Sequence, residues 1–289
     1  MDTILRGSGT EVVISPDRPA VIIGNWLDVR RRQDLVAALE REDMTFVARE
    51  AAAQAEAGAN VIGIYVGGVG VDEVEMLPRL VDVVTEAVPL PVSIEADDPA
   101  ALAAALETCP GRPLVSSVTT GEFSLGEFLP LAVDHGAAVL GLAREPAGVP
   151  KAVDDRVELA RHTMRMIITA GIDREDVVID PVTLPLEERP EDVTTLLETI
   201  AQVRQIEDIN VAASVGVVSK GLPNGDAVEA LFVAMVLEAG ATCLVGDPAQ
   251  IQRAKRMAEA LLRGEAAIER YVEAVKSNSP PGEGSEFTA

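Results

Sequence analysis

The sequence is poor in aromatic residues, cysteine and histidine. Aromatic side chains make up 3% of the 289 residues, so Ala, Val, Leu and Ile must fill the core of a chain that is 48% hydrophobic. The two cysteines, Cys109 and Cys243, lie far apart in sequence, which is typical of reduced thiols in a cytoplasmic protein. With two histidines in the chain, a metal site rich in His or Cys is not expected.

Long apolar runs and positive charge are also scarce. No uncharged apolar run reaches the roughly 18 residues of a membrane-spanning helix, and the N-terminal MDTILRGSGT does not resemble a secretory signal. The net charge of −23 would repel phosphate, so nucleic acid is not an expected partner. We therefore expect a cytoplasmic protein. Such an acidic composition is typical of salt-rich cytoplasms and also of proteins from GC-rich genomes.

One pattern recurs along the chain: a helical stretch ends in a small-residue turn and leads into a short apolar strand. It is seen in AAAQAEAGANVIGIYVGG, FLPLAVDHGAAVLGLARE, TMRMIITAGIDREDVVIDP and FVAMVLEAGATCLVGDP. In each segment a glycine occupies the place where a helix C-cap needs a left-handed residue. The strands are continuous apolar runs, which are typical of parallel strands buried on both faces.

The whole chain divides into strand–helix units of this kind. The predicted strands lie near 19–25, 60–66, 90–96, 113–119, 137–142, 176–182, 210–217 and 241–246. The predicted helices lie near 43–57, 72–87, 99–108, 126–135, 151–170, 190–206, 226–239 and 248–263. Eight units in about 260 residues predict an α/β fold, a closed (β/α)₈ TIM barrel, with a doubly wound open sheet as the alternative. We expect one domain over residues 1–265, followed by a helix end and a disordered tail over 266–289.

Ligands of such barrels bind at the C-terminal ends of the strands, so the polar residues there are the candidates for a site. They are Asn25, Asp28, Tyr65, Glu95, Asp97, Asp98, Ser116, Ser117, Arg144, Glu145, Asp180, Ser214, Ser219 and Asp247. Asp98 and Asp247 each precede a proline and a helix, which favours helix N-caps. Tyr65 is also compatible with sealing the barrel mouth, and Ser116 with filling space in its strand.

Two carboxylates in this set are harder to explain structurally. Glu95 and Asp180 each end a buried apolar run, and a buried charge is costly unless it is paired or used. Pro181 fixes the backbone after Asp180, and the next predicted helix starts too far away for simple capping. These features favour a functional role for Asp180.

From about Val21 to Leu262 the chain resembles the pterin-binding methyltransferases, the barrel family that includes dihydropteroate synthase. The similarity is carried by VIIGNWLD, in the place of a Gly-Glu-Arg-Ile-Asn motif, and by AEAGANVIGIYVG, LAVDHGAAVLGL, VVIDPVTLP and FVAMVLEAGATCLVGDP. It is greatest for methyltetrahydrofolate:corrinoid/iron–sulfur protein methyltransferases. The resemblance implies a TIM barrel, tetrahydrofolate or methyltetrahydrofolate as substrate, a corrinoid (cobalamin) supplied by a partner protein, and a homodimer.

Among the pterin-recognition positions that the resemblance implies, Asp180 alone is unchanged. The substituted positions are Asn25 and Asp28 in the first motif, Gly63 and Tyr65 on the second strand, Glu95 on the third, Ser116 on the fourth and Val217 on the seventh. A pterin presents an edge of N–H donors beside an acceptor, which carboxylates and amides match. Each unpaired group costs roughly 1–3 kcal/mol, so these substitutions bear directly on the ligand.

Three functions remain compatible with this pattern. The first is methyl transfer between tetrahydrofolate, or a related small carrier, and a corrinoid protein. In it Asp180, Asn25 and Asp28 are catalytic, and the substrate-binding residues are Glu95, Ser116, Asp180, Tyr65, Ser214 and Ser219. The second is corrinoid-dependent transfer from a methoxylated aromatic or a methylated amine, because Tyr65 and Trp26 offer aromatic faces. The third is a non-catalytic barrel subunit of a methyltransferase complex.

Overall fold

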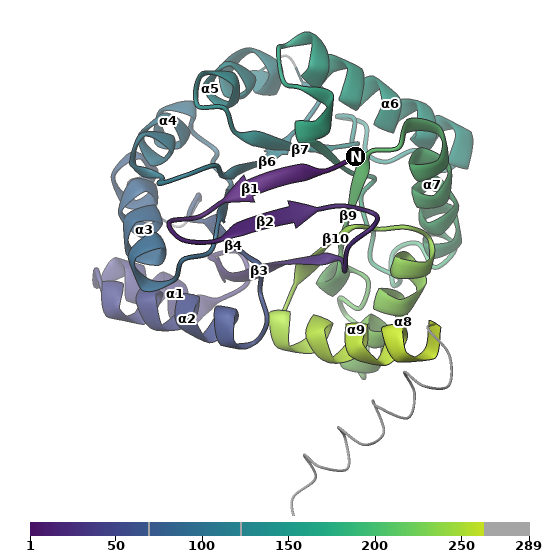
Figure 1. Ribbon diagram of the computed structural model, residues 1–289. Helices are drawn as coiled ribbons and strands as arrows, with labels where there is room; N and C mark the ends of the chain where they lie inside the picture. The colour runs from purple at the N-terminus through teal and green to yellow at the C-terminus, as the bar shows by residue number, and fades with distance from the viewer. Residues whose placement is uncertain (69, 122, 263–289) are drawn as a thin grey trace, which may run out of the picture.

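The eight predicted strands form a closed parallel barrel in the computed structural model, which describes residues 1–68, 70–121 and 123–262 (Figure 1). The barrel strands are β3 (Val21–Asp28), β4 (Val61–Tyr65), β5 (Val92–Ile94), β6 (Leu114–Val118), β7 (Ala138–Leu142), β8 (Val177–Asp180), β9 (Asn210–Ser214) and β10 (Cys243–Gly246). They follow one another in chain order around the barrel, and β10 pairs with β3 to close it. The TIM barrel prediction is confirmed.

Helices surround the barrel as an outer ring (Figure 1). They are α1 (Gln33–Glu40), α2 (Met44–Glu56), α3 (Glu73–Ala87), α4 (Pro99–Thr108), α5 (Leu129–Asp134), α6 (Val153–Thr169), α7 (Asp192–Glu207), α8 (Gly225–Glu238) and α9 (Pro248–Leu262). The glycines of the four recurring segments, Gly58, Gly136, Gly171 and Gly240, all have positive φ, between 60° and 111°. The predicted left-handed turns after these helices are therefore confirmed.

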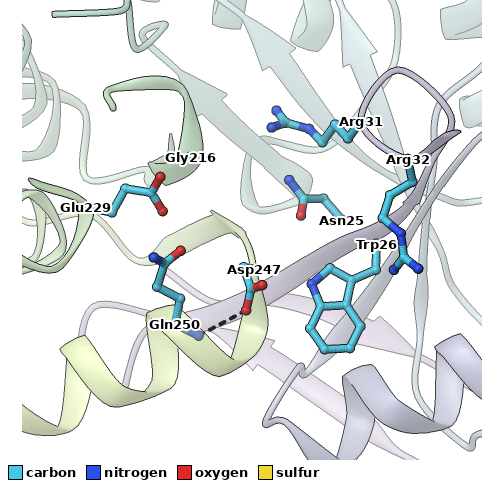
Figure 2. Close-up of a pocket in the computed structure, with 8 residues that line it drawn as sticks. All are labelled: Asn25, Trp26, Arg31, Arg32, Gly216, Glu229, Asp247 and Gln250. Atoms are coloured by element: carbon cyan, nitrogen blue, oxygen red, sulfur yellow. Dashed lines mark hydrogen bonds between the residues drawn. The ribbon is translucent and has the colours of Figure 1, made fainter. Parts of the chain in front are cut away.

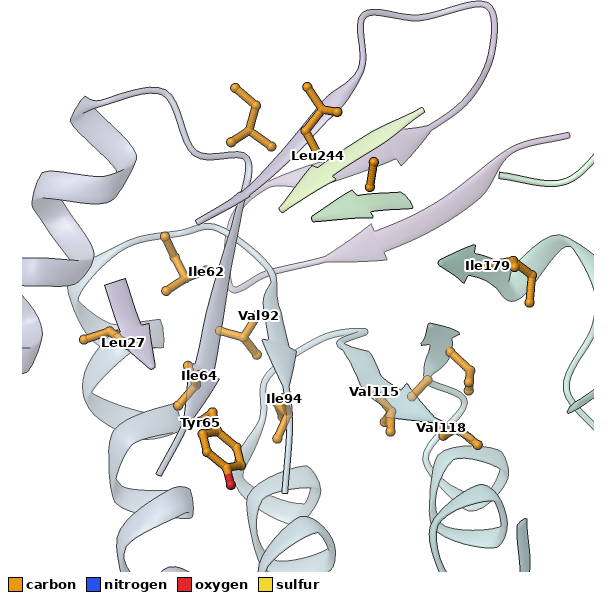
Figure 3. Close-up of a cluster of buried hydrophobic side chains, with 14 of the residues drawn as sticks. Leu27, Ile62, Ile64, Tyr65, Val92, Ile94, Val115, Val118, Ile179 and Leu244 are labelled. Atoms are coloured by element: carbon orange, nitrogen blue, oxygen red, sulfur yellow. The ribbon is translucent and has the colours of Figure 1, made fainter. Parts of the chain in front are cut away.

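Residues that point outward from the strands pack against the helices. Figure 3 shows part of this layer, in which Ile62, Ile64, Ile94 and Ile179 are fully or almost fully buried. Each such side chain stabilises the fold by roughly 1.5–3 kcal/mol relative to an exposed position. Since aliphatic residues supply nearly all of this layer, the core is built as the low aromatic content predicts.

The opposite strand faces meet inside the barrel and are closed off by a hairpin that the sequence did not predict. It consists of β1 (Thr3–Arg6) and β2 (Glu11–Ile14), which pair antiparallel and lie across one end of the barrel in Figure 1. Leu5 and Ile14 pack against inward residues from the start of the barrel strands, such as Val21 and Val61. The hairpin therefore closes the N-terminal end, and the open mouth lies at the C-terminal ends of the strands.

Several element boundaries differ from the sequence predictions. The first barrel strand extends to Asp28 because its pairing with β4 shifts between Gly24 and Leu27, which accommodates the polar Asn25 in a bulge. The seventh ends at Ser214, since Val215–Val217 forms a short 3₁₀ helix, η3.

Other short elements were missed or merged. Helix α1 was not predicted, and the predicted helix 126–135 consists of a π-helical turn, η1 (Ser124–Phe128), followed by α5. A 3₁₀ turn, η2 (Arg174–Asp176), precedes β8. The predicted tail 266–289 lies outside the described residues, and the single-domain boundary at 265 stays a prediction. Within the described ranges no helix is long and apolar enough to cross a membrane.

Candidate functional site

Several of the predicted polar residues lie on the inward face of the barrel, closer to the C-terminal ends of the strands than the apolar interior. Side chains alternate along a strand, so residues two positions apart share a face. Ile23, Leu114, Val178 and Ala212 are inward core residues. Two positions further along the same strands come Asn25, Ser116, Asp180 and Ser214. The strand pattern thus delivers a ring of polar groups to the mouth of the barrel.

Asp180 is the carboxylate of this ring, and it is buried. Its side chain accepts a hydrogen bond from the Val182 backbone N–H (2.7 Å, Oδ1) and one from the Ser214 hydroxyl (3.2 Å, Oδ2), and the residue is 4% exposed. Burial raises the pKa of Asp180 to about 6, and the two hydrogen bonds offset part of this effect. A carboxylate with two donors retains acceptor capacity, so Asp180 can accept further N–H groups from a ligand.

The backbone after Asp180 is held in a rarely adopted conformation. Val182 has φ = 68°, which is unusual for a β-branched residue and costs of order 1–3 kcal/mol. This conformation places the Val182 N–H on the Asp180 carboxylate. Pro181 restricts the chain between them. The turn therefore orients the Asp180 carboxylate. Asp180 does not cap a helix, which agrees with the expectation from the sequence.

Asp28 and Glu95 lie together because Arg30 bridges them. The Arg30 guanidinium binds both oxygens of Glu95 at 2.8 Å and contacts both oxygens of Asp28 at 2.9 and 3.0 Å. The Arg30 backbone N–H also donates to Asp28, as does Arg31 Nε at 3.3 Å. Asp28 is 6% exposed, and its oxygens organise the turn between β3 and α1. In this state, both predicted acceptors are paired with arginine.

Tyr65 completes this cluster on β4. The Arg30 guanidinium carbon lies 3.8 Å from the centre of the Tyr65 ring, an arrangement that is favourable for a cation over an aromatic face. The Tyr65 hydroxyl donates to Asp97 Oδ2 at 2.7 Å. Burial and the nearby Asp97 raise the pKa of Tyr65 above its usual range, so the hydroxyl remains a donor at neutral pH. We call Asp28, Arg30, Tyr65 and Glu95 the Arg30 cluster.

A cavity of about 430 Å³ lies at the barrel mouth beside Arg31 and Arg32, which follow Arg30 in the chain (Figure 2). It is lined by Asn25, Trp26, Arg31, Arg32, Gly216, Glu229, Asp247 and Gln250. Asp180 is not among the lining residues, but β9 connects the two: Ser214 donates to Asp180, and Gly216 two residues later lines the cavity. The cavity and the buried carboxylate are therefore neighbouring parts of one barrel mouth.

Asn25 joins two sides of this cavity. With the side-chain amide oriented so that both of its polar atoms are satisfied, its nitrogen donates to the Gly246 carbonyl at 3.0 Å and its oxygen accepts from Arg31 Nε at 3.3 Å. The following Trp26 N–H donates to the buried Gln54 side chain of α2 at 3.1 Å, which fixes the bulge of β3. The bulge thus positions Asn25 and Trp26 at the cavity wall, where Figure 2 shows both.

The remaining predicted residues have more structural roles. Ser116 is half-buried on β6, where it pairs in register with Leu140. The buried Ser219 donates its hydroxyl to Glu229 of α8, and Glu229 lines the cavity. Gly63 has no room for a side chain, since a Cβ there would lie 2.8 Å from the Gly24 carbonyl oxygen.

The structure confirms two expected helix caps. Asp98 accepts from the Ala100 N–H at 2.8 Å, and Asp247 accepts from the Gln250 N–H at 3.0 Å. Asp247 also lines the cavity. Among the described residues, no group of three or more His, Cys, Asp or Glu side chains is arranged to hold a metal ion.

Sequence reasoning missed the arginines of the site and Glu229. Arg30, Arg31 and Arg32 are consecutive and directly follow the first barrel strand, in a chain with only 24 basic residues. This placement was a usable signal, because a rare positive cluster at the end of a strand faces the mouth. Glu229 lies in the second turn of α8 and is half-buried, and nothing in the sequence distinguishes it from other acidic residues on helices.

Comparison with known proteins agrees with this geometry. A methylcorrinoid:tetrahydrofolate methyltransferase of Eubacterium limosum is 29% identical over 214 residues, which cover 73% of this chain and 79% of that protein. A methionine synthase of Mycobacterium tuberculosis is 25% identical over 224 residues, 74% of this chain but 19% of the synthase.

Among solved structures, the fold is similar to two dihydropteroate synthases. The enzyme from Xanthomonas albilineans, in complex with 7,8-dihydropteroate, superposes with a TM-score of 0.70 at 18% identity over 91% of this chain and 100% of that one. The Yersinia pestis enzyme gives a TM-score of 0.65 at 15% identity over 92% of this chain and 100% of that one. At these identities the superpositions show a shared fold.

The sequence model of the pterin binding enzymes matches residues 35–261, which span β4 to β10 and the helices between them. The match includes Asp180 and Glu95, and the barrel brings both to the mouth. On this evidence the chain belongs to the pterin-binding enzyme family.

Proposed function

We propose that the protein is a methyltransferase that moves a methyl group between tetrahydrofolate, or a related small carrier, and a corrinoid protein. The observation that carries the proposal is the buried, inward-facing Asp180 at the barrel mouth, which keeps acceptor capacity for an N–H group of a pterin. Family membership and the methylcorrinoid:tetrahydrofolate methyltransferase relative support the same substrate class.

The local chemistry suits recognition of a neutral ring with several donors. A carboxylate oxygen accepts an N–H of the amino group of an aminopyrimidinone, and the low dielectric around Asp180 strengthens such a bond. Ligand donors also relieve the desolvation that raises the Asp180 pKa, since a hydrogen bond to the charged form favours that form. Binding of a pterin edge and ionisation of Asp180 therefore support each other.

Methyl transfer to or from a folate nitrogen also requires control of the protonation of that nitrogen. When the nitrogen loses the methyl group it keeps the electron pair of the broken N–C bond, and protonation makes it a better leaving group. We assign Asn25 and Ser116 to the part of the site that faces the reacting folate nitrogen. Each lies two positions beyond an inward residue, Ile23 or Leu114. The corrinoid is carried by the partner, whose docking place we assign to the open mouth.

A second candidate function has one specific observation in its favour. Trp26 lines the 430 Å³ cavity together with the carboxylates Glu229 and Asp247. An aromatic face beside carboxylates is a favourable environment for a methylated ammonium group. Under this alternative the methyl donor is a methylated amine. A screen of methylated amines and methyltetrahydrofolate with a corrinoid protein separates the two functions.

Calorimetric titration with tetrahydrofolate and methyltetrahydrofolate tests the proposal directly. We expect micromolar binding in the wild type and a loss of about 30-fold or more in Asp180→Asn, which presents an amide donor to the ligand's N–H groups. The matched control is Asp43→Asn, because Asp43 is an exposed N-cap of α2 and asparagine caps equally well. Equal affinity in Asp180→Asn and wild type would remove the central assignment.

Catalysis needs its own measurement. Methyl transfer is followed by the absorbance change of the corrinoid, with a corrinoid protein or free methylcobalamin as the second substrate. Turnover that depends on Asp180 would support the methyltransferase. Folate binding without any turnover would instead favour the non-catalytic subunit.

A further inference from the structure

The Arg30 cluster shows what kind of group fits between its carboxylates. A guanidinium is flat, carries N–H groups on a shared N–C–N unit and binds a carboxylate through two parallel hydrogen bonds. Arg30 makes this two-point contact with Glu95, at 2.8 Å for each bond, while its flat face lies 3.8 Å from the Tyr65 ring centre. The place is thus built as a two-oxygen acceptor beside an aromatic face.

The same description fits one edge of a pterin. Its 2-amino group and adjacent ring nitrogen form a cyclic guanidine, which is flat and has the same N–C–N arrangement of donors. Glu95 follows β5 at the mouth, two residues beyond the buried Ser93. A ligand that reaches Glu95 from the mouth therefore meets an acceptor that is already filled by the chain's own arginine.

We propose that Arg30 is a specificity-determining residue that occupies, with its own guanidinium, the place of the ligand's guanidine-like edge, so that a pterin must displace it from Glu95. This inference rests on the proposed function, because it takes the ligand to be a pterin. It assigns to Arg30 a role in binding strength and selectivity and none in the methyl-transfer step.

The surroundings of Arg30 allow this displacement. Its side chain is 49% exposed, and the residue lies in the short turn between β3 and α1. The turn itself is held by the Arg30 backbone N–H on Asp28 at 2.9 Å, which persists when the side chain moves. Asp28 also keeps its contact with Arg31 Nε at 3.3 Å. The guanidinium can therefore leave Glu95 for solvent while the backbone stays in place.

The test compares two flat ring systems on wild-type protein and Arg30→Ala. 6-Methylpterin has the cyclic guanidine edge, whereas 6-methyllumazine has an oxygen in place of the 2-amino group and lacks it. We expect Arg30→Ala to bind the pterin about tenfold more tightly than the wild type, the effect of one charge-assisted hydrogen-bonded pair, with no gain for the lumazine. Adding Glu95→Gln to Arg30→Ala should cancel the gain.

The matched control is Arg6→Ala. Arg6 is a half-exposed arginine paired with Glu11 at 3.1 Å in the hairpin at the opposite end of the barrel. Removing it lowers the positive charge by the same amount without touching the mouth, so pterin affinity should stay at the wild-type value. Thermal unfolding of each variant checks that the fold is retained.

Salt gives a second readout. The Arg30–Glu95 pair is half-exposed, so raising NaCl from about 0.05 to about 1 M should weaken it and tighten pterin binding in the wild type. Arg30→Ala should lack this salt response.

The outcomes separate this inference from the proposed function. Wild-type pterin binding that depends on Asp180 but does not improve in Arg30→Ala would overturn the role of Arg30 and leave the function standing. An equal gain for pterin and lumazine would also overturn it, because Arg30 would then be only a steric obstacle. Failure of every variant to bind any pterin would overturn the proposed function and this inference with it.

Discussion

At the scale of single residues, Asp180 combines a functional position with an energetic cost. The only partners described for its side chain are the Val182 N–H and the Ser214 hydroxyl, whereas Asp28 and Glu95 are both paired with Arg30. A buried carboxylate without a cationic partner destabilises the folded state at neutral pH. The site is therefore expected to be a place where stability and ligand binding oppose each other.

We predict that Asp180→Asn stabilises the unliganded protein at pH 7. The folded-state pKa is raised from 3.8 to about 6, so between these values the folded state binds more protons than the unfolded state. The contribution of Asp180 protonation to the free energy of unfolding is thus fully present below pH 3.8 and is lost as the pH rises through 6. Asparagine is neutral throughout, so we expect a gain of about 1–3 kcal/mol at pH 7 that shrinks toward pH 4.

Chemical denaturation of both proteins at these two pH values measures the gain. The difference between variant and wild type isolates Asp180 from the other titrating groups. A variant that is less stable than the wild type at pH 7 would show that the ionised carboxylate has a stabilising partner.

At the scale of elements, an ion pair anchors the loops beside β8. Arg156 of α6 is 1% exposed, pairs with Asp192 at the start of α7 and donates to the Pro150 carbonyl at 2.7 Å. Arg189, from the loop that starts at Asp180, also contacts Asp192 at 3.1 Å. The pair therefore joins the loop after β7 to the loop after β8, and it fixes the far end of the segment that carries the Val182 turn.

Removing one partner of this pair should be costly. We predict that Asp192→Ala lowers the free energy of unfolding by about 3–5 kcal/mol, because it leaves the Arg156 charge buried without compensation. Replacing both partners by apolar residues, Arg156→Met with Asp192→Leu, should cost much less. Urea denaturation of the two variants decides this; equal losses in both would mean that packing, and not charge, dominates at this position.

For the N-terminal hairpin we predict an effect on stability and none on ligand binding. Leu5 is fully buried between the hairpin and the barrel interior. Leu5→Ala should destabilise the protein by about 2–5 kcal/mol through the lost contacts and the cavity left behind. Ligand affinity, measured calorimetrically at a temperature where the variant is folded, should stay unchanged, since the hairpin lies at the end opposite the mouth. A change in affinity would contradict the separation of the two ends.

Elements also show what the sequence could and could not predict. The barrel strands were predictable because continuous apolar runs alternate with helices that end in Gly58, Gly136, Gly171 and Gly240. The hairpin was missed because its four-residue strands are short and polar at one end, so they give no clear periodic signal. Helix α1 was missed because three arginines precede it without a capping side chain.

The site was predictable to the extent that strand parity decides it. Asp180 and Ser214 reach the mouth because they are the last residues of their strands and lie two positions beyond inward-facing core residues, which a sequence displays. Side-chain pairing across the mouth was not predictable, because Arg30 meets Glu95 from 65 residues away. Such a contact depends on the parallel pairing of β3, β4 and β5, which brings the ends of these strands together.

At the scale of the whole molecule, the charge balance sets the response to salt. The chain has 47 acidic and 24 basic residues, and mutual repulsion of the excess carboxylates disfavours the compact state. We predict that the unfolding temperature rises by several degrees as NaCl is increased to about 0.5 M, where screening is nearly complete. Differential scanning calorimetry measures this, and an unfolding temperature that falls with salt would show that attractive ion pairs outweigh the repulsion.

In the part of the chain that the structure describes, the hairpin and the apolar interior close the N-terminal end of the barrel. A ligand of the polar ring around Asp180 is therefore expected to arrive and depart past the C-terminal ends of the strands. In the proposed reaction, the small carrier and the corrinoid protein share that entrance. We therefore expect the small carrier to bind before the corrinoid protein docks and to leave after it departs, an order that originates in a strand pair far from the chemistry.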